Sequence, residues 1–227
     1  MPTVQTNNKS INIDNFSLLC QETAKAQQVL WQLPVINQAL RGGLSVATYL
    51  AFLARAYHHV KHTVPLLMLT GALIKPEDEW LRTAMAEYIE EELGHEHWIL
   101  NDIAACGGEA DLVRLSQPSF AVEMMVAYAY DSINRIDPLC FLGMVHVLEG
   151  TSVALATRAA HSLKKSLNLP TKAFSYLISH GDLDQGHQQF FANLINRLDR
   201  HQLAVVTQAC RRFYRLYSNV FKELPRS

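Results

Sequence analysis

The chain has 227 residues, of which 49% are hydrophobic and 18% are charged, with a formal net charge of −1 at pH 7. This composition supplies enough apolar side chains for a sizeable core and excludes global disorder. The nearly neutral charge gives no basis for binding nucleic acid or an anionic membrane surface.

The predicted elements are helices separated by proline and glycine, and no segment alternates as a strand does. Several are long and joined by short loops, which indicates antiparallel neighbours. The predicted fold class is therefore all-α, a compact bundle of about seven helices. We expect one domain over 14–227 after a disordered or extended tail over 1–13. The expected helices cover 14–32 with a continuation to 40, 45–74 with a bend near Pro65, 76–105, 118–134, 137–166, 170–199 and 201–222.

The cellular compartment is predicted from cysteine usage and from the N-terminal composition. The four cysteines are far apart and form no Cys-x-x-Cys pair, so they do not indicate a disulfide framework or a thiolate zinc site. Residues 1–13 lack the basic-then-apolar order of a signal peptide. No apolar run is judged long enough to span a bilayer. A cytoplasmic protein without membrane partners is expected.

The third expected helix carries charged side chains within its apolar stripe. Glu92 and His95 fall on the same face as Leu81, Met85 and Tyr88. An acidic run of this kind is ordinarily a solvated face. A buried carboxylate, however, is costly unless it is paired or binds a metal. The Glu-x-x-His spacing, which sets a carboxylate and an imidazole on adjacent turns, is that of ferritin-like dimetal proteins.

The fifth expected helix holds a single formal charge in an apolar stretch. Between Leu139 and Thr157 that charge is Glu149, and His146 lies three residues before it. A helix that is apolar nearly all round is a buried one. Glu149 is thus a second candidate ligand, although a hydrogen bond or one salt bridge would also satisfy it.

The sixth expected helix carries three potential ligands, His180, Asp184 and His187, in the pattern His-x-x-x-Asp-x-x-His. Offsets of four and seven residues keep their side chains within a narrow wedge of the helix. A lone histidine on an apolar face is more often a satisfied core residue. Three such groups on one stripe favour a metal site.

These clusters together predict a metal centre inside the bundle. Imidazole and carboxylate ligands without thiolate suit iron, manganese or zinc. Six candidate ligands exceed the three that a catalytic zinc uses, so two ions bridged by carboxylates fit the number better. The alternative is a metal-free binding protein in which the same groups hydrogen-bond to one another.

These motifs resemble those of the heme-oxygenase-like superfamily over roughly residues 45–195, most specifically its diiron oxidases (the iron-containing redox enzyme family). That group carries a Glu, often with a nearby His, on one core helix, a Glu on the next, and His-x-x-x-Asp-x-x-His on a later one. The matching residues here are Glu92, His95, Glu149, His180, Asp184 and His187.

The resemblance implies a fold like that of TenA and pyrroloquinoline-quinone synthase. It also implies two iron ions that alternate between Fe(II) and Fe(III), with manganese or zinc as alternatives. The expected function is oxidation of a small-molecule substrate by dioxygen, while the substrate itself stays open. A homodimer is one option, because such bundles often pair.

One segment departs from the pattern of that group, whose members usually supply a further Glu from the preceding core helix. Residues 45–75 contain no Asp or Glu but do contain His58, His59 and His62. We hypothesise that His59 or His62 replaces the missing carboxylate. A heme-binding alternative also stays open, because heme oxygenases hold their iron through a histidine on an early helix.

A rival resemblance is to thiaminase II proteins, in which a nucleophilic Cys follows a proline near the start of a core helix. Pro138-Leu139-Cys140 is similar in position, but the Glu expected ahead of an aromatic pair falls near His187. Cys140 is therefore more readily explained as a packed core thiol.

Tyr88 is the candidate catalytic residue beside the predicted metal site. It lies one and two turns before Glu92 and His95, so it is positioned to donate a hydrogen bond beside the metals. An ordinary core tyrosine is the alternative.

Overall fold

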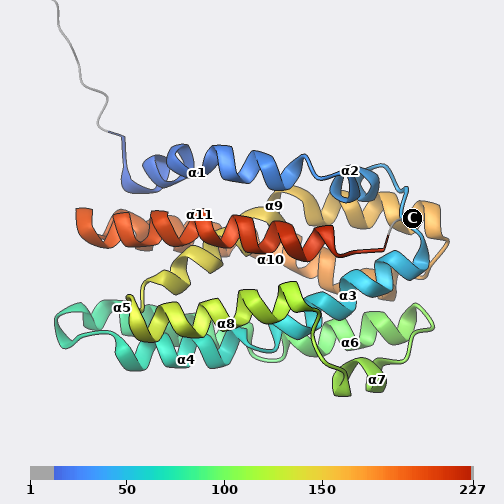
Figure 1. Cartoon of the computed structure of the whole chain (residues 1–227), viewed down its shortest axis with the longest axis horizontal. Coiled ribbons are helices and arrows are strands. Elements are labelled where there is room, and N and C mark those ends of the chain that lie inside the picture. Colours follow the sequence, from blue (N-terminus) through green and yellow to red (C-terminus); the bar gives the residue numbers. More distant parts are fainter. Residues whose placement is uncertain (1–12, 226–227) are drawn as a thin grey trace, which may run out of the picture.

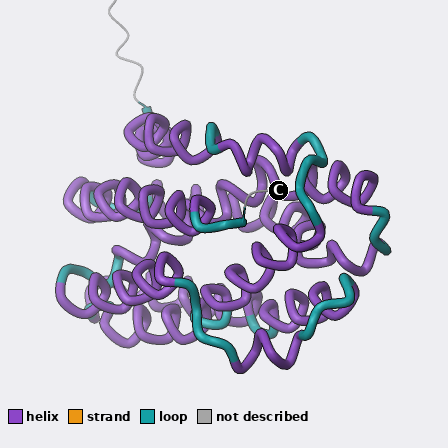
Figure 2. Tube along the Cα trace, turned by 45° about the vertical axis from the view of Figure 1, so that its right-hand side comes forward, coloured by secondary structure: helices purple, strands orange, loops and turns teal. Residues whose placement is uncertain are grey.

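In the computed structural model, residues 13–225 are described, apart from the side chains of 180–185. Every regular element in that part of the chain is helical (Figure 2), which confirms the all-α prediction. The larger number of helices, compared with the seven expected, comes from breaks inside the expected ones and from α7, which lies between two of them. The elements are α1 (Asn15–Trp31), α2 (Pro34–Leu40), α3 (Val46–Val60), α4 (Thr63–Leu73), η1 (Pro76–Asp78), α5 (Glu79–Glu92), α6 (His95–Ala105), α7 (Ala110–Leu115), α8 (Phe120–Arg135), α9 (Cys140–Leu167), η2 (Thr171–Phe174), α10 (Ser175–Asn196) and α11 (Arg200–Lys222).

The helix expected over 45–74 is two helices, and its break is not at Pro65. The chain turns at Lys61 and His62, and Pro65 is the third residue of α4. Proline is tolerated in the first turn of a helix because the backbone N–H groups there have no intrahelical acceptor. Pro65 therefore lies in the first turn of a new helix and does not bend an old one.

The expectation of one helix over 76–105 is wrong at the residues that matter most. Glu92 is the last residue of α5, and His95 is the first residue of α6. Gly94 between them has a φ of 89°, a left-handed conformation that favours glycine and often ends helices. Glu92 and His95 thus lie on two helices, and their common stripe does not exist.

Helix α9 lies at the centre of the bundle, where it packs against α10, α11, α8 and α2. Figure 1 shows α1 and α2 along one edge of the molecule and α4, α5, α6 and α7 along the opposite edge. The expectation that no apolar run could span a bilayer is wrong for α9, which is long and apolar enough by length and composition. However, 56% of its most apolar window is buried in the fold, as in a core helix.

The buried apolar residues form two clusters that share α9. One cluster includes its first half, up to Val147, together with α4, α5, α8 and α11. The other includes its second half, from Ala156, together with α3, α6 and the start of α10. The boundary between the clusters also passes the α3–α4 turn and the α5–α6 turn. The candidate ligands on α9 and α5 lie at this boundary, which we call the seam.

The N-terminus of α10 is fixed by Asp102 of α6, which is fully buried. Its carboxylate accepts backbone N–H bonds from Ser175 at 3.1 Å and Tyr176 at 2.9 Å, and a bond from the Ser175 hydroxyl. Burial raises the pKa of Asp102, while these hydrogen bonds act to lower it. A carboxylate at a helix N-terminus also complements the helix dipole, so Asp102 anchors the helix that carries His187.

Two glycines of α9, Gly143 and Gly150, have different amounts of space around them and test how closely this helix packs. A Cβ on Gly143 would lie 2.6 Å from the Ala209 Cβ and 2.7 Å from the Cys210 backbone nitrogen, whereas one on Gly150 would meet nothing within 4 Å. We expect Gly143→Ala to destabilise the fold by about 1–3 kcal/mol. Gly150→Ala should stabilise it by about 0.5–1 kcal/mol. Urea unfolding measures both, and equal stability of the two variants would contradict the close α9–α11 contact.

Candidate metal centre

Three of the predicted ligands come together at the seam. Glu92 from the end of α5, Glu149 from the middle of α9 and His187 from α10 each offer a ligand atom, and these atoms all lie within 4.8 Å of one another. They come from segments separated by more than thirty residues. The expected convergence of three helices is therefore present for these three side chains.

The surroundings of this cluster favour a bound cation. The side chains of Glu92 and His187 are only 10% and 9% exposed. Two carboxylates held this close and away from water repel each other, unless a proton or a positive charge lies between them. Oxygen and imidazole donors suit iron, manganese or zinc. The donor set therefore fits a metal ion.

His95 contacts Glu92 and is not part of the cluster of three. Its Nδ1 lies 3.1 Å from a Glu92 carboxylate oxygen, and its ring stacks on Trp98 at 4.1 Å. The Gly94 turn brings the first residue of α6 back against the last residue of α5. In this structure His95 orients Glu92, in the way that groups around a metal site hold its ligands.

Glu91 pairs with His187, a contact that the sequence reasoning missed. The His187 Nε2 lies 3.0 Å from a Glu91 carboxylate oxygen. A carboxylate that accepts a hydrogen bond from one imidazole N–H fixes the tautomer and leaves the other nitrogen free to bind a metal through its lone pair. Two neighbouring residues of the acidic run therefore have different roles. Glu92 belongs to the cluster, whereas Glu91 contacts His187, another residue of the cluster.

The two histidines proposed to replace a missing carboxylate have different locations. His59 is buried and lines the same cavity as Glu92 and Glu149, and its ring meets Tyr217 edge-on at 5.8 Å. It does not belong to the cluster within 4.8 Å. The His62 Nδ1 lies 3.1 Å from the Tyr130 hydroxyl, outside the cavity lining. The structure thus places His59 in the wall of the cavity that Glu92 and Glu149 also line, and His62 outside that wall.

His180 and Asp184 belong to α10, but their side chains lie outside the described residues. Their place on the same helical stripe as His187 stays a prediction from their spacing.

Tyr88 lies beside His187, one member of the cluster. It is 1% exposed, lines the cavity one turn before Glu92, and meets the His187 ring edge-on at 6.4 Å. Tyr88 is therefore next to the ligands, as the sequence predicted, and its catalytic role stays a prediction.

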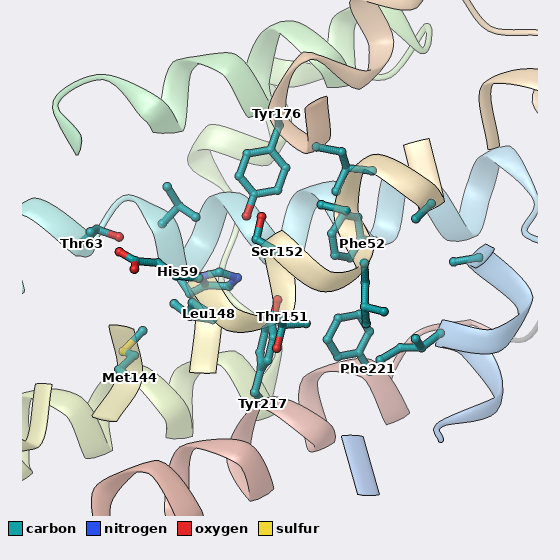
Figure 3. Close-up of a pocket in the computed structure, with 18 of the residues that line it drawn as sticks. Phe52, His59, Thr63, Met144, Leu148, Thr151, Ser152, Tyr176, Tyr217 and Phe221 are labelled. Atoms are coloured by element: carbon teal, nitrogen blue, oxygen red, sulfur yellow. The ribbon is translucent and has the colours of Figure 1, made fainter. Parts of the chain in front are cut away.

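A cavity of about 140 Å³ extends from the carboxylates along α9. In Figure 3, His59 and Thr63 lie on one side of the view and Phe52 and Phe221 on the other, with Ser152 between them. The space holds roughly ten water molecules or one small organic molecule. A reacting group placed in it would meet Glu92, Glu149 and Tyr88.

The family of the chain follows from a comparison with family sequence profiles. The profile described as iron-containing redox enzyme matches residues 50–218. The chain belongs to this iron-containing redox enzyme family. All three residues of the cluster lie within the matched segment. No curated protein sequence matches the chain.

Several solved structures have the same fold as this chain. A Shewanella denitrificans domain of unknown function with a heme oxygenase-like fold aligns with a TM-score of 0.83 and 22% identity, covering 94% of this chain and 92% of that one. A TenA homologue from Pseudomonas syringae aligns with a TM-score of 0.79 and 12% identity, covering 99% of this chain and 98% of that one. Heme oxygenase from Leptospira interrogans aligns with a TM-score of 0.75 and 16% identity, covering 93% of this chain and 100% of that one. The heme-oxygenase-like, TenA-like fold that the sequence predicted is confirmed.

Cys140, the nucleophile of the rival prediction, is 3% exposed and does not line the cavity. Burial raises the pKa of its thiol to about 11, helped by the charge of Asp137. A thiol with such a pKa is protonated near neutral pH and is a poor nucleophile. The TenA-like fold is therefore present without the activated cysteine that displacement chemistry needs.

His146 precedes Glu149 by one turn on α9 but contacts another part of the fold. Its Nε2 lies 3.4 Å from the Thr23 hydroxyl, and its ring stacks on Phe191 at 5.8 Å. Burial lowers the pKa of His146 from 6.5 to about 4. His146 is a neutral core residue and not part of the cluster.

This buried histidine predicts how stability depends on pH. The unfolded chain protonates His146 near pH 6.5 and the folded chain only near pH 4, so its contribution is complete above pH 6.5 and is lost as the pH falls toward 4. We expect the free energy of unfolding, measured in urea, to fall as the pH decreases from about 6.5 to about 4. The fall should be smaller in His146→Gln. An equal fall in both proteins would contradict the assignment.

Proposed function

We propose that the protein is a non-heme, iron-dependent oxidoreductase that uses dioxygen to oxidise a small molecule in the α9 cavity. The observation that carries the proposal is the convergence of Glu92, Glu149 and His187 from three helices to within 4.8 Å. Membership of an iron-containing redox enzyme family supports iron as the metal.

The number of candidate ligands supports a pair of ions. Glu92, Glu149 and His187 form the cluster, and Asp184 and His180 precede His187 at helical spacing on α10. A carboxylate has two oxygens and bridges two ions readily, so two acidic residues or more suit a two-ion site better than a one-ion site. His59 is a further histidine in the wall of the same cavity.

The charge of the cavity favours free iron ions over heme. Heme carries two propionates, which need cationic partners. Among the described residues that line the cavity, formal charges are confined to the carboxylates Glu92 and Glu149. These carboxylates stabilise a metal cation and repel an anionic porphyrin.

The chain's own residues would prepare the site for the reaction. Reduced iron, when bound, supplies the electrons that activate dioxygen. Glu92 and Glu149 hold cations, His95 and Glu91 fix the orientation of Glu92 and His187, and the apolar walls exclude water. Tyr88, beside Glu92 and His187, is positioned to exchange a proton with a group at this end of the cavity.

Metal loading tests the proposal directly. After anaerobic loading with Fe(II) and desalting, we expect about two iron ions per chain and oxygen consumption when air is admitted. Glu149→Gln removes one negative charge without changing the size of the side chain, so it should retain much less iron and consume little oxygen. Elemental analysis and an oxygen electrode measure the two quantities.

Cys140→Ser is the matched control on the same helix, because Cys140 lies outside the cavity. It should load iron and consume oxygen as the unchanged protein does. Failure of the unchanged protein to retain iron would leave a metal-free binding protein. Binding of added hemin with high affinity would overturn the non-heme assignment.

The role of Glu91 is testable separately. If its carboxylate orients His187, Glu91→Ala should weaken metal binding roughly 10- to 100-fold, as measured by competition with a chelator of known affinity. Glu90→Ala removes an equal charge from an exposed neighbour on α5 and should change the affinity little. The same loss in both variants would mean that the overall negative charge matters and the contact with His187 does not.

A further inference from the structure

The walls of the cavity differ sharply between its two ends. Near the cluster they include the carboxylates Glu92 and Glu149 with His59 and Thr63. The far end is lined by apolar side chains of α2, of the loop after it, of the first turns of α3, of the end of α11 and of the segment that follows α11. These are Val35, Ile36, Ala39, Leu40, Leu44, Phe52, Phe221 and Leu224.

The cavity is long as well as apolar, because it follows one side of α9. Lining residues recur on this helix from Glu149 through Ser152, Leu155 and Ala159 to Leu163. At about 1.5 Å per residue, Glu149 and Leu163 are about 21 Å apart along the helix axis. A ligand that fills this space must be elongated.

We propose that the substrate of this site is an elongated molecule with an aliphatic tail, which lies along α9 while its polar head meets Glu92, Glu149 and the metal. The proposal deepens the proposed function and rests on it for the reaction at the head. Its physical basis is separate: the described residues that line the walls beyond Ser152 carry no charge. A second ionised group on the ligand would be buried there without a partner, at high cost.

The walls predict how affinity depends on chain length. Each methylene removed from water adds roughly a threefold to fourfold gain in affinity, until the tail fills the cavity. We expect butanol, hexanol, octanol and decanol to bind with rising affinity to the iron-loaded protein under anaerobic conditions, as measured by calorimetry. Octanoate and octylamine, compared with octanol, identify the preferred head group.

A bulky side chain introduced at the far end of the cavity tests where the aliphatic tail of the ligand lies. Ala159→Trp fills the α2 end of the cavity, so it should weaken decanol binding at least tenfold and leave butanol binding unchanged. Ala154→Trp is the control, because Ala154 is on the same helix but does not line the cavity. Iron content, measured for each variant, reports whether the cluster and the fold remain intact.

Each outcome separates this proposal from the proposed function. Equal binding of butanol and decanol, or an unchanged decanol affinity in Ala159→Trp with normal iron content, would overturn the assignment of the tail. Length-dependent binding of the alcohols to a protein that retains no iron would support the tail site and overturn the iron-dependent function. Tighter binding of a diacid than of the matching monoacid would contradict the proposal that the tail of the ligand is uncharged.

Discussion

The structure depends on keeping two carboxylates close together between two apolar clusters. Glu92 and Glu149 approach each other and His187 at the seam, and Glu92 is 10% exposed. In water each carboxylate would be hydrated and the two would separate. Inside the bundle their repulsion needs a positive charge between them. The fold thus creates an electrostatic demand that a bound cation would satisfy.

The seam explains why the helices break where they do. The α5–α6 turn at Gly94 and the α3–α4 turn at His62 both lie on it. At each break the chain passes from one apolar cluster to the other. Helix α9 crosses the seam without a break and contributes Glu149 at the crossing. Polar side chains gather at the seam because neither cluster closes over them.

The same arrangement joins the cluster of candidate ligands to the cavity. The backbone of α9 carries a carboxylate toward the cluster at Glu149 and apolar side chains toward the open end from Leu155 onward. Asp102 fixes the start of α10, which supplies Tyr176 to the cavity wall and His187 to the cluster. Helices α9 and α10 therefore each contribute both a side chain of the cluster and side chains of the cavity wall.

The sequence by itself determined the helical class and singled out Glu92, Glu149 and His187, the three side chains that come together in the structure. A lone Glu149 in a long apolar helix and the spacing about His187 are local patterns, and these are readable without a structure. The sequence also contained Gly94, the signal for the break between Glu92 and His95, but helical periodicity alone extended the helix through it.

Only the tertiary structure decided which of these groups meet. The contact of Glu91 with His187, the location of His59 in the cavity and of His62 outside it, and the burial of Cys140 all depend on how helices distant in sequence pack. Periodicity specifies the face of a helix on which a side chain lies. The partner of that face is set by long-range packing, which no local pattern of residues contains.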